Sequence, residues 1–206
     1  MNNRFFGRML NSTIVAAIAL VGLPAQAALI FGPDIIAAPA FVTNASVTNI
    51  HQQGFNEQQG VTLGAALAVD AGFISARTVV DSHMIFFNIS STVSSGADIE
   101  TWVFDGVILG VMSDTGGTLE AASTPILGAL GTTYQAPLTN RGLEAGTADS
   151  YTVAGNTIIV NMNVAQPGDW IRVVTATDVP EPGSVALLGL GLAGLGFSRR
   201  RKQQTA

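Results

Sequence analysis

Apolar and β-branched positions along this chain are grouped in short runs, and Gly, Asn, Asp and Pro residues separate the runs. Short apolar runs bounded by turn-forming residues are typical of β-strands. The runs are residues 41–50, 61–69, 73–80, 84–90, 99–112, 151–154, 157–164 and 170–175. About eight strands with this spacing predict an all-β fold, a single antiparallel β-sandwich or jelly roll.

The clearest pair of strands is residues 151–154 and 157–164, which Gly155 and Asn156 separate. Both of these residues tolerate positive φ, as a two-residue hairpin turn requires. The second strand alternates in character, so one set of side chains is predicted to face the core and Asn161 and Asn163 to face water. The core set is Ile158, Val160, Met162 and Val164.

Two breaks in the strand pattern are also predicted. The long run 99–112 contains Asp105-Gly106, where we expect the chain to bend. Pro125, with hydroxyl residues before it, predicts a short helix over residues 123–128, with a hydroxyl cap and the proline in its first turn.

Residues 1–27 have the pattern of a secretory signal peptide. Arg4 and Arg8 precede an apolar stretch at 14–23, and Ala25 and Ala27 satisfy the small-x-small rule for cleavage. We therefore predict that signal peptidase cleaves after Ala27. The alternative, a retained membrane helix, is disfavoured by the short apolar stretch and by Pro24.

The other end of the chain has three consecutive parts. An extended Pro-Glu-Pro element is followed by an uncharged run at 184–198 and then by a basic cluster. A helix over 184–197 is about 21 Å long, shorter than the roughly 30 Å hydrocarbon core, so it predicts a weak and transient membrane anchor. The residues that define the signal are Val179, Pro180, Glu181, Pro182, Arg199, Arg200 and Arg201.

Residues 179–202 resemble the PEP-CTERM sorting signal of bacterial surface proteins, because the three parts occur in the same order. An ordinary C-terminal anchor is the alternative. The resemblance implies recognition and cleavage by an exosortase, a membrane protease-transpeptidase. It further implies export through the inner membrane, an anchored precursor, and a product at the cell surface or outside it. Proteins of this group are linked to exopolysaccharide and biofilm production in Gram-negative bacteria.

The part between the two end segments, residues 28–178, also resembles an ectodomain that recurs in proteins with this tail. No activity is implied by that resemblance. The segments that carry it are residues 51–63, 80–88, 108–114, 141–144 and 169–174.

This predicted body contains three arginines, no lysine and 13 of the 14 acidic residues, which gives it a net charge of −10. Such a charge repels nucleic acid and anionic lipid surfaces, so neither is an expected partner of the body. The chain has no cysteine, so the body depends on a packed core, and about 150 residues are enough for one domain. Arg141 and Arg172 are expected to pair with carboxylates, Arg141 with Glu144.

No catalytic residue is predicted. Asp81, Ser82 and His83 are the residue types of a hydrolase triad, but neighbours in a strand point to opposite faces and cannot form that relay. His51 lies in a polar stretch, residues 51–59, that we expect to be a loop. Two histidines without cysteine also disfavour a structural zinc site.

Calcium is the one cofactor that the sequence suggests, because acidic, glycine-bearing loops offer the oxygen ligands that it prefers. Solvated acidic turns are the alternative interpretation. The candidate ligands are Asp98, Glu100, Asp114, Glu144 and Asp149.

These observations favour an exported, non-enzymatic surface or extracellular-matrix protein. A lectin-like, calcium-dependent carbohydrate-binding module is the alternative, with extracellular polysaccharide as its partner, and a glycosidase is the third. Exposed aromatic rings at Trp102, Trp170, Tyr134 and Tyr151 would favour the lectin, because sugars stack on such faces, whereas buried rings would favour the structural protein.

Overall fold

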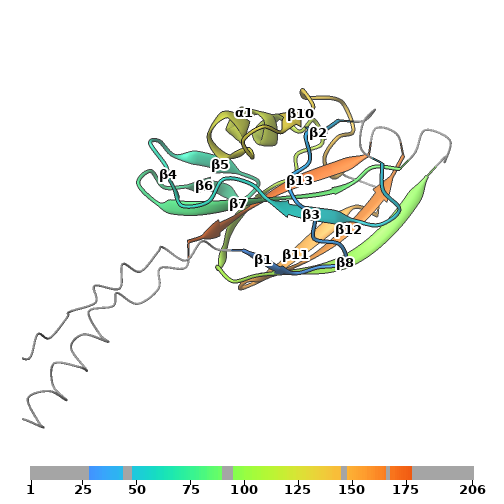
Figure 1. The fold of residues 1–206 in the computed structure, drawn as a ribbon, viewed down its shortest axis with the longest axis horizontal. Helices are drawn as coiled ribbons and strands as arrows, with labels where there is room; N and C mark the ends of the chain where they lie inside the picture. The colour runs from blue at the N-terminus through green and yellow to red at the C-terminus, as the bar shows by residue number, and fades with distance from the viewer. Residues whose placement is uncertain (1–27, 44–47, 90–94, 145–147, 166–167, 178–206) are drawn as a thin grey trace, which may run out of the picture. The chain divides into compact units, whose positions relative to one another are not determined.

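The computed structural model describes residues 28–177, apart from residues 44–47, 90–94, 145–147 and 166–167. These residues lie within one compact unit. Two β-sheets face each other, and the helix α1 (Thr118–Leu127) lies on the outer side of one of them (Figure 1). The predicted all-β class is confirmed, and the two sheets form a sandwich.

The first sheet has four antiparallel strands in the order β1-β8-β12-β11. Their bounds are Leu29–Phe31 (β1), Gly96–Phe104 (β8), Thr157–Val164 (β12) and Ser150–Ala154 (β11). The hairpin between β11 and β12 is confirmed, with Gly155 at φ 64°. The alternation in β12 is also as expected, because the four predicted core side chains are buried while Asn163, like Ile159, is exposed.

The second sheet has five strands in the order β3-β7-β13-β9, with β4 also paired to β7. Their bounds are Gln53–Asn56 (β3), Val79–Phe87 (β7), Asp169–Ala176 (β13), Ile108–Met112 (β9) and Val61–Thr62 (β4). β7 and β13 are central and are buried along almost their whole length. Both faces of this sheet are therefore covered.

The main core lies between the two sheets. Trp102 and Phe104 of β8 and the apolar face of β12 pack against Ile85 and Phe87 of β7 and against Ile171 of β13. The chain passes from one sheet to the other at the predicted bend, because β8 ends at Phe104 and β9 begins at Ile108 in the opposite sheet.

The outer face of the five-stranded sheet carries smaller elements and two more apolar clusters. These elements are α1, the parallel pair β2 (Phe41–Val42) with β10 (Thr133–Tyr134), and the hairpin of β5 (Leu67–Val69) with β6 (Gly72–Ile74). Leu127 of α1 packs in one cluster, and Trp170 of β13 is in the other.

The helix begins earlier than predicted, at Thr118 instead of residue 123, and Pro125 lies near its end. Its first turn is capped by Asp114, whose carboxylate accepts hydrogen bonds from the backbone N–H groups of Thr118 and Leu119. Pro125 has no N–H to donate to the carbonyl of residue 121, so one intrahelical hydrogen bond is absent in the last turns of α1. A helix was predicted correctly here, but its predicted start, with Pro125 in the first turn, was wrong.

Several predicted strand boundaries also change. The run 73–80 is interrupted by a turn in which Arg77 has φ 69°, and β7 then continues through Asp81, Ser82 and His83 without a break. The run 61–69 divides into β4 and β5, and among the described residues of the run 41–50 only Phe41–Val42 form a strand. β3 occupies part of the stretch predicted to be a loop, although His51 itself precedes it.

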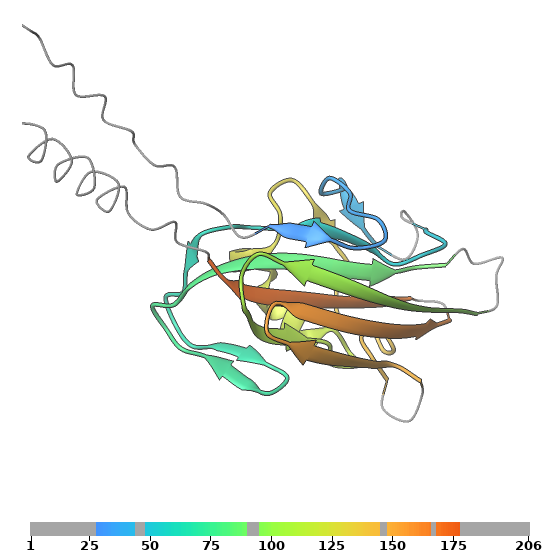
Figure 2. The ribbon, with the colours of Figure 1, turned by 90° about the horizontal axis from the view of Figure 1, so that it is seen from below.

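The two ends of the described body lie at the same end of the sandwich, which we call the exit end (Figures 1 and 2). The carbonyl of Ala28 accepts a hydrogen bond from the backbone N–H of Asp105, and the N–H of Ala176 donates to the carbonyl of Val107. Asp169, at the start of β13, is seven residues from Ala176, about 23 Å at the rise of an extended strand. We call the end that contains Asp169 the far end.

Candidate functional site

Three carboxylates from separate segments meet at the far end of the sandwich. Glu144 lies in a loop, Asp149 directly precedes β11, and Asp169 is the first residue of β13. One carboxylate oxygen from each lies within 4.8 Å of the other two. We call these three residues the carboxylate cluster. Calcium, with oxygen ligands at 2.3–2.6 Å, is an ion that such a set of donors is able to hold.

Asp169 is the least solvated member of the carboxylate cluster. The residue is 2% exposed, and its Oδ2 atom is buried with no hydrogen-bond partner among the residues that the structure describes. Burial, together with the nearby charges of Asp149 and Glu144, raises the pKa of Asp169 to about 9. Burial and the carboxyl of Asp149 raise the pKa of Glu144 to about 7. Three ionised carboxylates without a counter-ion are therefore unfavourable at this place, and either protons or a bound cation would stabilise the cluster.

Asp149 is held in place by the backbone. Its Oδ1 accepts a hydrogen bond of 2.6 Å from the N–H of Asn163 on β12, and its Oδ2 accepts one of 3.3 Å from the N–H of Glu144. The cluster thus joins the edge of the four-stranded sheet to the first residue of β13 in the five-stranded sheet.

The structure brings together only two of the five predicted metal ligands, Glu144 and Asp149. Asp114 caps α1, and Asp98 of β8 accepts a hydrogen bond of 2.7 Å from the backbone N–H of Gln52. Glu100 lies on β8 two residues from Asp98, and neither belongs to the cluster. Asp169 was missed because it stands outside the acidic loops. The available signal was a carboxylate at the start of an otherwise apolar, buried run, where charged residues are rare.

A second group of charges, buried between the five-stranded sheet and α1, links two arginines to two glutamates. Arg172 of β13 donates two hydrogen bonds to the carboxylate of Glu57, at 2.6 and 2.7 Å. Arg141 donates to Oε2 of Glu120 on α1 at 2.9 and 2.6 Å. The side chains in these pairs are at most 1% exposed.

Both arginines pair with carboxylates as predicted, but the predicted partner of Arg141 was wrong, since it binds Glu120 and not Glu144. The guanidinium of Arg141 also lies 4.9 Å from the ring centroid of Trp170. Arg172 donates further to the carbonyl of Glu120 and to the hydroxyl of Ser123. These contacts dock α1 on the sheet, so the network has a structural role.

The three triad-type residues of β7 each have other partners. Ser82 donates to Glu57 at 2.6 Å, and Asp81 accepts from the backbone N–H of Gly60. The two ring nitrogens of His83 lie 2.8 Å from Asn56 Oδ1 and 3.1 Å from Thr175 Oγ1. Burial lowers the pKa of His83 to about 3, so the ring is neutral at physiological pH.

The tryptophan rings do not form an exposed platform. Trp102 is 0% exposed and its indole N–H donates to Gln52, while Trp170 is 1% exposed. Tyr134 and Tyr151 are partly buried, and their hydroxyls are bonded to the N–H of Ala129 and the carboxylate of Asp70.

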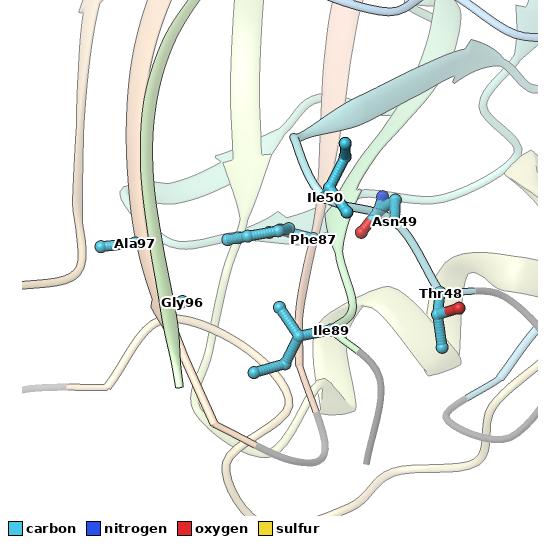
Figure 3. Close-up of a pocket in the computed structure, with 7 residues that line it drawn as sticks. All are labelled: Thr48, Asn49, Ile50, Phe87, Ile89, Gly96 and Ala97. Carbon is cyan, nitrogen blue, oxygen red and sulfur yellow. The ribbon is translucent and has the colours of Figure 1, made fainter. Parts of the chain in front are cut away.

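A pocket of about 300 Å³ opens at the far end, between the last residues of β7 and the first of β8. Figure 3 shows Phe87 and Ile89 on one side and Gly96 and Ala97 on the other. The one amide in its lining, that of Asn49, is already bonded to Phe86, Gln53 and Asn88. The described residues that line the pocket do not supply the converging polar groups that fix a small ligand.

The predicted sorting signal and signal peptide lie outside the described residues, and the sequence comparisons test the first of them. Residues 178–202 match the family model of the PEP-CTERM protein-sorting motif. This chain carries a PEP-CTERM motif. The motif indicates an exported protein that an exosortase-type system sorts, with a membrane-anchored precursor that is then delivered to the surface.

Beyond the PEP-CTERM motif the comparisons add nothing. No curated protein and no solved structure matches the chain. The resemblance of residues 28–178 to a recurrent ectodomain therefore stays a prediction. Among the residues described by the structure, no helix combines the length and apolar character needed to span a bilayer.

Proposed function

We propose that this chain is a non-enzymatic component of the cell surface or extracellular matrix, associated with exopolysaccharide or biofilm. The observation that carries the proposal is the place of the PEP-CTERM motif in the chain. β13 ends at Ala176 and the motif begins at residue 178, so the connection between them is one residue long. A tail held in the membrane would therefore tether the sandwich through the residue that follows β13.

The burial of the aromatic rings supports a structural protein over a lectin. Sugar-binding sites commonly stack the ligand on an exposed aromatic face, and both tryptophans of this body are inside the core. The carboxylate cluster at the far end is the observation that favours the second candidate, a calcium-dependent carbohydrate-binding module. A glycan array with the exported protein, run with calcium and with chelator, separates the two. Calcium-dependent capture of a defined glycan would replace the structural proposal with the lectin.

The side-chain partners in β7 support a non-enzymatic role. Ser82 and His83 both use their polar atoms for hydrogen bonds inside the fold, and they bond to different residues. The expected result is that purified protein releases no reducing sugar from extracellular polysaccharide above background. Release that disappears when one carboxylate is neutralised would instead assign a glycosidase.

The sorting step is tested by Glu181→Ala in the full chain, expressed in a host that contains an exosortase. Glu181 is the only charged residue of the Pro-Glu-Pro element, and the substitution leaves the apolar run and the basic cluster intact. We expect the variant to accumulate as an unprocessed precursor in the membrane fraction and to be lost from the matrix fraction.

Ser184→Ala is the matched control, because it also removes one polar side chain from the tail but leaves Pro-Glu-Pro unchanged. It should be processed as the wild type is. Normal release of Glu181→Ala would show that the element is not what the sorting system recognises. A processed protein that never enters the matrix fraction would refute the proposed matrix role alone.

A further inference from the structure

We infer that Glu144, Asp149 and Asp169 form a binding site for calcium at the far end of the sandwich. The inference goes beyond the proposed function and is independent of it, because it depends only on the geometry of the described body. A surface protein with or without calcium is compatible with exosortase sorting.

The separation of the three carboxylates suits this ion. Two oxygens on opposite sides of a calcium ion are about 4.6–5.2 Å apart, twice the usual bond length. The cluster oxygens lie within 4.8 Å of one another, which is close enough for all three to bind one calcium ion. Magnesium demands near-ideal octahedral geometry at about 2.0–2.1 Å and gives up its water ligands reluctantly, so it is less suited than calcium to a site made of protein carboxylates. Zinc prefers nitrogen and sulfur ligands, which the cluster does not contain.

The buried oxygen of Asp169 is the observation that points to a ligand. Oδ2 is inaccessible to solvent and has no hydrogen-bond partner within the described structure. Buried carboxylates are nearly always paired, hydrogen-bonded or bound to a metal, because the cost of an isolated buried charge is large. A cation between the three residues supplies the missing partner.

No arginine of the described body is placed to neutralise the cluster. Arg141 and Arg172 donate to Glu120 and Glu57, and Arg77 is exposed in the turn before β7. Residues 28–178 contain no lysine. The positive charge that the cluster attracts must therefore come from solution, as an ion or as protons.

A bound ion would also act on the fold. Asp149 is fixed to β12 through the N–H of Asn163, and Asp169 begins β13 in the opposite sheet. Calcium would cross-link the two sheets at the far end. Calcium should therefore stabilise the folded state, and its binding should be measurable as a change in the unfolding temperature.

The first experiment titrates calcium chloride into the exported protein, freed of metal by chelator, and follows heat release and thermal unfolding at neutral pH. Extracellular calcium modules bind with Kd of about 10⁻⁴–10⁻³ M. For the tighter value, about 10 mM calcium is 100 times Kd and should raise Tm by about 5–10 °C. Magnesium at the same concentration should give a much smaller shift.

The second experiment repeats the titration with Glu144→Gln and Asp169→Asn, each of which removes one charge and keeps the shape of the side chain. Glu100→Gln is the matched control, since Glu100 is a partly exposed carboxylate outside the cluster. Both cluster variants should lose the calcium-dependent rise in Tm, and the control should keep it.

The result that overturns the site is a wild-type protein with the same Tm in calcium and in chelator and with no heat of binding. The wild-type measurement tests the site even if one of the variants does not fold. Retention of the full calcium shift by Asp169→Asn would also overturn it. If both cluster variants are more stable than the wild type in chelator and calcium has no effect on any of them, the cluster holds protons and not a metal.

Discussion

Substitution of Arg172 by methionine tests the buried ion network, because methionine keeps an unbranched chain and removes the charge. In the wild type, Nε and Nη2 of Arg172 donate to the two oxygens of Glu57, whose side chain is fully buried. The variant leaves that carboxylate without its ion partner. Removal of one partner of a buried pair costs about 3–5 kcal/mol.

That cost is a large share of the free energy of unfolding, which is about 5–15 kcal/mol for a domain of this size. With about 2–4 °C of Tm lost for each kcal/mol, we expect Tm to fall by about 6–20 °C. The measurement is urea unfolding and thermal melting followed by circular dichroism. Arg77→Met is the control, since Arg77 is exposed, and its effect should stay within about 0.5 kcal/mol.

The double variant Glu57→Gln with Arg172→Met separates the ion pair from the packing. It removes both charges, so it should be more stable than Arg172→Met alone, and the double-mutant cycle should give a coupling energy of at least about 1 kcal/mol. The reasoning fails if Arg172→Met is no less stable than Arg77→Met. It fails equally if the double variant is no more stable than Arg172→Met alone.

Two further predictions concern export and pH. N-terminal sequencing of the exported protein should begin at Ala28, and a sequence that begins at Met1 would contradict cleavage after Ala27. The pKa of His83 is about 3 in the folded protein and about 6.5 in the unfolded chain, so between these values only the unfolded state binds the proton and stability falls as the pH is lowered. Urea unfolding between about pH 6 and about pH 4.5 should show a loss of about 1.4 kcal/mol per pH unit from this residue. The loss should be absent in His83→Gln, and equal pH dependence in both proteins would exclude His83 as its cause.

The polar stretch in β7 shows why some strand boundaries could not be predicted. Asp81, Ser82 and His83 are hydrophilic, and their local pattern suggests a break between two strands. In the structure they are 0% exposed, because Gly60, Glu57 and Thr175 provide hydrogen bonds from other segments. The strand continues because its polar groups are satisfied by residues that are distant in sequence.

The sequence alone determined the features that depend on neighbouring residues. The hairpin at Gly155 and Asn156 follows from the positive φ that Gly155 adopts and from alternation with a period of two, and both act over a few positions. The all-β class follows from many such runs. The PEP-CTERM motif was recognisable for a related reason, because it is a linear signal that a partner recognises in order along the chain.

Only the tertiary structure decided which charges meet. Glu57 and Arg172 are 115 positions apart, and the pairing of Arg141 with Glu120 instead of Glu144 depends on where α1 packs. Asp169 joins Glu144 and Asp149 because β13 begins beside the segment that enters β11, in the opposite sheet. Contacts of this kind are set by the packing of sheets and helix into one core, and no pattern within a short window of sequence encodes them.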